Sequence, residues 1–168
     1  ISCENSDLKK GDLGKEDEDG TLEKDHGYSF EVPATTTMEM VTPVPLKSMG
    51  RFARNAVLVH APSGVVYQTE DEINGVFYRY LPTTPGKLGN GGKLQAMVIK
   101  DWPSADTRNW ECLKSPKFPM QKRFDVEWID IDHPEAPAND LRMRANKMGA
   151  ARFSSAAGMW QQGNQIFI

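Results

Sequence analysis

Residues 53–100 contain four short apolar or aromatic runs, and this pattern constrains the fold more than any other feature of the chain. Each run is followed by turn residues such as Gly, Pro or Asn, as is typical of successive β-strands. The runs are residues 56–60, 65–69, 76–80 and 94–100. Four strands of this length with turns between them form one antiparallel sheet of the size of a propeller blade. We therefore predict an all-β fold, a β-propeller, in which residues 53–100 make a complete four-stranded blade.

The rest of the chain is expected to belong to the same domain, so that residues 1–168 form a single partial β-propeller. Pro43 and Pro45 suit an edge strand, since proline cannot donate a hydrogen bond to a neighbouring strand. Residues 140–148 are predicted to form a short helix. The expected parts are the outer strands of a blade at 28–52, a loop-rich insertion at 101–150 with one strand at 125–132, and the start of the next blade at 151–168.

Composition excludes several classes of protein. The net charge of -3 argues against nucleic-acid binding, which requires a basic face. No apolar run approaches the roughly 20 residues of a membrane-spanning helix, and the first residues contain no signal peptide. The chain begins with Ile1 and ends within an apolar run, so we expect a central piece of a longer protein. Cys3 and Cys112 permit one disulfide without requiring it.

Three consecutive acidic residues follow the second predicted strand. Glu70, Asp71 and Glu72 would place their carboxylates at one rim of the sheet, where they suit a hard cation such as calcium. The alternative is a polar hairpin turn in which Asn74 and Gly75 supply the positive φ angles. The spacing alone favours the turn over the metal site.

Two other segments offer metal-ligand chemistry. A cysteine thiolate next to a carboxylate, as in Cys3 and Glu4, is able to bind a transition metal, although a lone cysteine is more often without such a role. The acidic run at 16–19 does not fit a calcium-binding EF-hand, because that frame places Lys15 and His26 at ligand positions. We interpret this run as a solvated loop.

Several segments, in the same order along the chain, resemble the PhoX-type alkaline phosphatases. These are secreted calcium-dependent phosphomonoesterases with a β-propeller fold. The resemblance spans nearly the whole chain, and each segment alone is only moderately specific. The segments are residues 2–5, 22–32, 49–52, 64–71, 75–82, 127–132, 149–153 and 158–160.

The resemblance implies an active site made of iron and calcium ions, with small phosphoesters as substrates. Cys3 corresponds to the family's iron-binding cysteine, and Glu4 lies beside it. Asp71, together with Glu70, corresponds to an acidic strand end that faces a calcium ion. Clustered cations neutralise phosphate charge and activate an oxygen nucleophile. The resemblance also implies export to the periplasm or out of the cell.

The chain departs from the family pattern at two places. Relatives carry a His-Glu pair where this chain has Arg54 and Asn55, and an arginine and a glutamate where it has Ser155 and Ala157. The resemblance implies that the lost glutamates are metal ligands and that the lost arginine contacts phosphate. Loss of these glutamates removes negative charge that would balance the metal ions, so the affinity for the metals should fall. Two further hypotheses therefore stand beside the phosphatase: a non-catalytic propeller used for binding or structure, and an inactive fragment.

Overall fold

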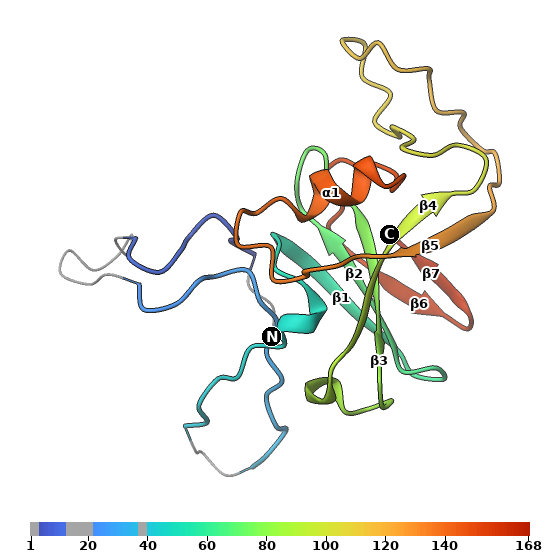
Figure 1. Cartoon of the computed structure of the whole chain (residues 1–168). Coiled ribbons are helices and arrows are strands. Elements are labelled where there is room, and N and C mark those ends of the chain that lie inside the picture. Colours follow the sequence, from blue (N-terminus) through green and yellow to red (C-terminus); the bar gives the residue numbers. More distant parts are fainter. Residues whose placement is uncertain (1–3, 13–21, 37–39) are drawn as a thin grey trace.

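An antiparallel sheet forms the centre of the protein in the computed structural model, which describes residues 4–12, 22–36 and 40–168. Its five strands follow one another in space in the order in which they occur in the sequence (Figure 1). Each strand pairs with the next by an antiparallel ladder. The strands are β1 (Arg54–His60), β2 (Val65–Glu70), β3 (Phe77–Pro82), β4 (Gly92–Ile99) and β5 (Val126–Asp130).

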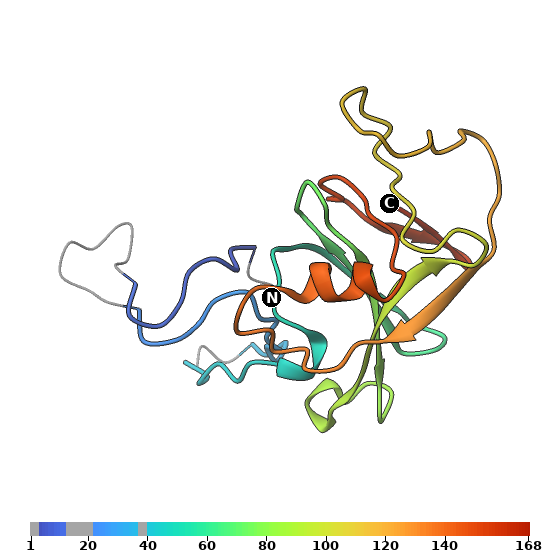
Figure 2. The same ribbon diagram turned by 45° about the horizontal axis from the view of Figure 1, so that its top comes forward.

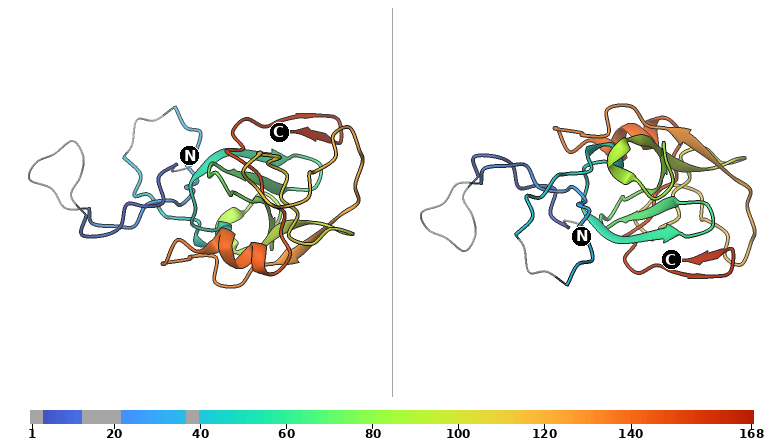
Figure 3. Two further views of the ribbon diagram at one scale, coloured as in Figure 1. Left: turned by 90° about the horizontal axis from the view of Figure 1, so that it is seen from above. Right: turned by 90° about the horizontal axis from the view of Figure 1, so that it is seen from below.

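Opposite faces of this sheet are covered by different elements. The helix α1 (Leu141–Lys147) lies on one face, and a hairpin of β6 (Trp160–Gln162) and β7 (Gln165–Phe167) lies on the other, as the view from above shows (Figure 3). Two short 3-10 helices, η1 (Lys47–Met49) and η2 (Leu88–Asn90), complete the regular elements of the described residues.

The main core lies between the sheet and α1, which crosses in front of the sheet in Figure 2. Side chains alternate between the two faces of a strand, so every second residue of β2, β3 and β4 points toward the helix. Leu141 and Ala145 of α1 are buried against this face. The strand residues of the core are Val66, Tyr78, Tyr80, Leu94 and Ala96.

The opposite face of the sheet carries a cluster of aromatic side chains. Tyr67, Phe77 and Trp128 come from three strands, with ring centroids 5.9–6.0 Å apart. The Arg79 guanidinium lies 4.5 Å from the centroid of the Trp128 ring. Such ring contacts and cation–π contacts stabilise neighbouring strands across the sheet.

The prediction of an all-β chain is confirmed as a mostly antiparallel sheet with few helices. The propeller itself stays a prediction, because the described residues form neither a closed barrel nor a propeller. The strand expected at 125–132 is β5, and it extends the sheet beyond β4 to a fifth strand.

The stretch 28–52, where outer strands are expected, has one isolated bridge between Phe30 and Pro45 in its described part. Pro43 and Pro45 have no N–H group, so neither residue donates a hydrogen bond to a ladder near this bridge. Within the described residues, no helix has the length and apolar character to cross a membrane.

Candidate functional site

A β-bulge near the start of β1 shapes the candidate site. Arg54 pairs with Glu70 and Val57 pairs with Gln68, so Asn55 and Ala56 together lie opposite Thr69. The N–H of Ala56 donates to the Thr69 hydroxyl at 2.9 Å. Bulges of this kind often occur next to functional sites because they change the direction of a side chain. We call residues 54–56 and 69–71 the bulge region.

Asp71 presents an exposed carboxylate at the bulge region. Its backbone N–H donates to the carbonyl of Ala53 at 2.8 Å, which fixes the main chain one residue beyond β2. The Asn55 side chain donates to Asp71 Oδ2 at 3.4 Å. The carboxylate therefore keeps lone pairs that are accessible to a ligand from solvent.

The segment before β6 reaches the same region from far along the chain. The N–H of Ser155 donates to the carbonyl of Glu72 at 2.9 Å, and the Thr69 hydroxyl donates to the carbonyl of Ala157 at 3.1 Å. Both positions carry small side chains and line an open cavity of about 500 Å³. Phe77, Thr107, Phe153 and Ile168 form much of the remaining wall. Positions 155 and 157 thus contact Glu72 and Thr69, on either side of Asp71 in the sequence, at the end of β2 where Asn55 also lies.

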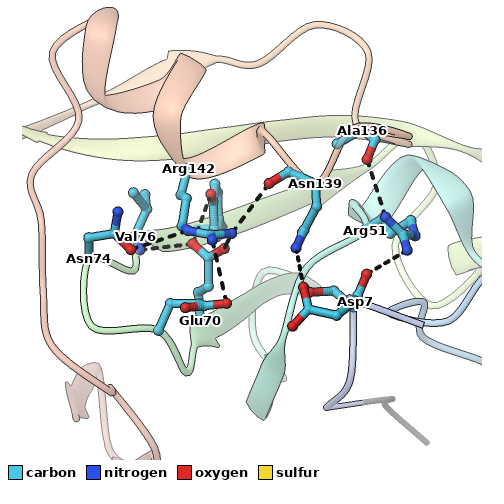
Figure 4. Close-up of polar contacts among 11 residues, drawn as sticks. Asp7, Arg51, Glu70, Asn74, Val76, Ala136, Asn139 and Arg142 are labelled. Carbon is cyan, nitrogen blue, oxygen red and sulfur yellow. Dashed lines mark hydrogen bonds and ion pairs between the residues drawn. The ribbon is translucent and has the colours of Figure 1, made fainter. Parts of the chain in front are cut away.

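Glu70 has a different environment, although it directly precedes Asp71. Its side chain is fully buried and points toward α1 (Figure 4). Oε2 accepts hydrogen bonds from the Val76 N–H at 3.0 Å and from the Tyr78 hydroxyl at 3.2 Å. Within the described residues Oε1 accepts no hydrogen bond, and it lies 3.7 Å from Arg142 Nη1. Burial raises the pKa of Glu70 to about 7, while Arg142 and the two donors act against that rise.

The loop after β2 is anchored to α1 by the same arginine. Arg142 Nη2 lies 3.5 Å from Glu72 Oε1, and Arg142 Nε donates to Asn74 Oδ1 at 3.2 Å. Gly75 then allows a close approach of two backbones, because a Cβ atom there would lie 2.5 Å from the Glu70 carbonyl oxygen. A polar turn is therefore present and is held against the helix. The expectation that Asn74 and Gly75 supply positive φ angles is wrong, since neither residue has one, and Gly75 is instead required by the close approach of the Glu70 carbonyl.

Arg54 is a structural residue in this fold. Its guanidinium is fully buried and donates to Gln68 Oε1 at 2.8 Å and to the carbonyls of Gly27, Met49 and Gly50 at 2.8–3.2 Å. It also lies 4.0 Å from the centroid of the Phe52 ring. Sequence reasoning missed this role and the role of Arg142. An arginine at the first position of an apolar strand was the available signal for Arg54.

Of the two predicted ligands near the N-terminus, the structure describes Glu4. Cys3 lies outside the described residues, as does the acidic run at 16–19. Glu4 is exposed and begins the segment that packs beside Arg51 and Asn139, where Asn139 donates to Asp7 at 2.8 Å. Figure 4 shows Asp7 and Arg51 on this side of the molecule.

The described residues do not by themselves form a metal site. Among them, no three His, Cys, Asp or Glu side chains gather in a group that would hold a metal ion. Asp71 fits a single carboxylate ligand for a hard cation, whereas Glu70 is enclosed by protein donors. A cluster of ions does not fit these residues on their own.

Comparison with known proteins identifies the family. Residues 5–168 match the family model described as alkaline phosphatase PhoX. Neither a curated protein nor a solved structure matches the chain. Because the family match covers nearly all of the sequence, the chain belongs to the PhoX alkaline phosphatase family.

Proposed function

We propose that this protein is a metal-dependent phosphomonoester hydrolase of the PhoX type. The family is one of metal-dependent phosphatases, and the match over residues 5–168 supports phosphoesters as the substrate class. We further propose that calcium and iron are the metals and that the protein acts in the periplasm or outside the cell. The observation that carries the proposal is the convergence of positions 55, 71, 155 and 157 on one end of the sheet.

We assign the metal-binding role to Asp71, with Cys3 and Glu4 as further ligands. Asp71 is the best supported of these, since its carboxylate is exposed and its backbone is fixed by the bond to Ala53. Glu70 is a weaker candidate, because two protein donors and Arg142 already surround its carboxylate. The bound cations would neutralise the charge of the phosphate and activate an oxygen nucleophile.

Asn55 and the cavity beside Ser155 and Ala157 would contribute to the site in different ways. The amide of Asn55 holds Oδ2 of Asp71 and leaves Oδ1 accessible. The open cavity beside Ser155 and Ala157 provides space for the organic part of a phosphoester. Its walls are largely apolar, with Phe77 and Phe153, so they contribute packing contacts and leave charge neutralisation to the cations.

Comparison of two aspartate variants tests this proposal. Asp71→Ala should abolish calcium binding and phosphatase activity toward 4-nitrophenyl phosphate, and a chelator should have the same effect on the unaltered protein. Asp132→Ala, at an exposed aspartate that follows β5, is the matched control and should change neither property. Activity that survives both the chelator and Asp71→Ala would contradict the proposal.

A non-catalytic binding or structural protein is the second candidate, and the residues at positions 55, 155 and 157 favour it. Asn55 is neutral, Ser155 has its N–H engaged by Glu72, and Ala157 contributes only a backbone carbonyl to this region. This candidate predicts a folded protein without metal or phosphatase activity. The triple variant Asn55→Glu, Ser155→Arg and Ala157→Glu tests this candidate. If the variant gains both metal binding and phosphatase activity, the result would support shared descent with active phosphatases.

A further inference from the structure

One guanidinium lies among the oxygen atoms of the turn that follows β2. We call residues 70–74 the acidic turn. Arg142 Nη1 lies 3.7 Å from Glu70 Oε1, and Arg142 Nη2 lies 3.5 Å from Glu72 Oε1. Arg142 Nε donates to Asn74 Oδ1 at 3.2 Å, and Nη1 donates to the Asn139 carbonyl at 3.4 Å (Figure 4). Two carboxylates, a side-chain amide and a backbone carbonyl therefore surround one positive charge.

These four groups are the oxygen ligands that calcium prefers in proteins. Here the positive charge is covalently attached to the chain through α1. The Arg142 side chain is 15% exposed and the Glu70 side chain is fully buried, so the ion pair has little access to water. A second cation in the same place would meet strong repulsion from the guanidinium at this low local dielectric.

The outer side of the acidic turn has its own cationic contact. Arg108 Nη1 donates to the carbonyl of Ile73 at 3.1 Å, while its other nitrogens bind both oxygens of Asp106 at 2.6–2.8 Å. The Asp106 carboxylate already neutralises Arg108. Arg142 is thus the cation that contacts both Glu70 and Glu72.

We propose that Arg142 is the resident cation of the acidic turn, so that Glu70 and Glu72 neutralise Arg142 instead of a bound metal ion. Arg142 is then a positioning residue: it fixes the acidic turn against α1 and leaves Asp71 as the acid of this turn that is available to a ligand. The part concerning Asp71 rests on the proposed function, whereas the part concerning Arg142 does not.

Calcium titration of two variants tests the assignment of the acids. In isothermal titration calorimetry, Asp71→Asn should lower calcium affinity at least 10-fold, whereas Glu72→Gln should leave it within 2-fold of the unaltered protein. A comparable loss of affinity in Glu72→Gln would overturn the proposal. Absence of calcium binding in the unaltered protein would contradict the proposed function alone, since the next experiment does not require that site.

Removal of the guanidinium tests the proposal independently. Calcium should raise the thermal stability of Arg142→Gln more than that of the unaltered protein, through an added site with an affinity on the order of millimolar, the range of weak calcium sites. Combining it with Glu72→Gln should remove the gain. Arg142→Lys keeps the cation and should show no gain. The matched control is Arg144→Gln, which removes the other arginine of α1 and its partly exposed ion pair with Asp140.

Each outcome for Arg142→Gln either supports or overturns the proposal that Arg142 is the resident cation of the acidic turn. A variant that folds only in calcium, or that calcium stabilises more than it stabilises the unaltered protein, supports the proposal. A folded variant that calcium stabilises no more than the unaltered protein overturns it. A variant that stays unfolded at all calcium concentrations also overturns it, because the proposal requires calcium to replace the guanidinium.

Discussion

The side-chain amide of Asn55 lies 3.4 Å from the carboxylate of Asp71, although 16 positions separate the two residues. The contact exists because the bulge in β1 places Asn55 opposite the end of β2. A glutamate at position 55 would bring a second carboxylate to this place. We therefore expect the residue at position 55 to influence the affinity of the bulge region for a cation.

Replacing three residues should strengthen metal binding. We expect Asn55→Glu with Ala157→Glu and Ser155→Arg to bind calcium about 10–100-fold more tightly, because two carboxylates join Asp71. Without calcium the same variant should be less stable than the unaltered protein, since like charges then face one another. Calorimetry and thermal unfolding measure both effects. Asn90→Glu, at an exposed position in η2, is the control, and equal affinity in the two variants would contradict the prediction.

Gly75 should be intolerant of a side chain. Its Cβ would lie 2.5 Å from the Glu70 carbonyl oxygen, and neither backbone is able to move without disturbing β2. We expect Gly75→Ala to reduce the free energy of unfolding by about 1–3 kcal/mol. Gly89→Ala has open space around the added methyl group and should change this energy by less than about 0.5 kcal/mol. Denaturant unfolding measures the free energy of unfolding of both variants. Equal losses would show that the close approach of the Glu70 carbonyl to Gly75 does not prevent a side chain at that position.

Glu70 should make stability depend on pH. Its pKa of about 7 in the folded protein lies above the ordinary value of 4.5, so the folded state binds the proton more tightly than the unfolded chain. The stabilising contribution of this group is complete below pH 4.5 and is lost as the pH rises through 7. Glu70→Gln removes the titration and should gain about 3 kcal/mol relative to the unaltered protein between pH 4.5 and 8.

Urea unfolding in metal-free buffer at both pH values measures that difference. The comparison between the two proteins cancels the titration of all other groups. A difference in free energy of unfolding that stays constant with pH would show that Glu70 does not titrate in this range.

Arg54 should be required for folding rather than for chemistry. Arg54→Met would remove the donor to the Gln68 oxygen and to the Gly50 carbonyl, whereas the carbonyls of Gly27 and Met49 keep a second donor. We expect a loss of at least about 2 kcal/mol in the free energy of unfolding. Arg54→Lys should lose less, because it keeps a charged donor. Arg123→Met, at an exposed arginine, should have little effect. A fully stable Arg54→Met would show that these contacts contribute nothing.

Local sequence patterns predicted much of the sheet and the short helix. The strands β1 to β4 lie where alternating apolar residues and turn residues indicate them, and α1 lies within the helix expected at 140–148. These features depend on residues close together in the sequence. The pairing of β5 with β4 depends on a connection of more than 20 residues, which a local pattern does not describe.

The candidate site was predictable only in part, for a similar reason. The acidic residues after β2 are visible in the sequence, and the polar turn is present. The separate environments of Glu70 and Asp71 arise from the bulge and from Arg142, which lies on α1 about 70 positions away. No spacing rule along the chain indicates that ion pair. Cys3 and Glu4 stay predictions.

Metal content tests the central claim most directly. Iron and calcium per chain should be measured by elemental analysis in the purified, folded protein and in Asp71→Ala. The account predicts bound metal in the unaltered protein and its loss in the variant. A folded protein that contains no metal, or a variant that retains all of it, would contradict the assignment of a metal site to Asp71.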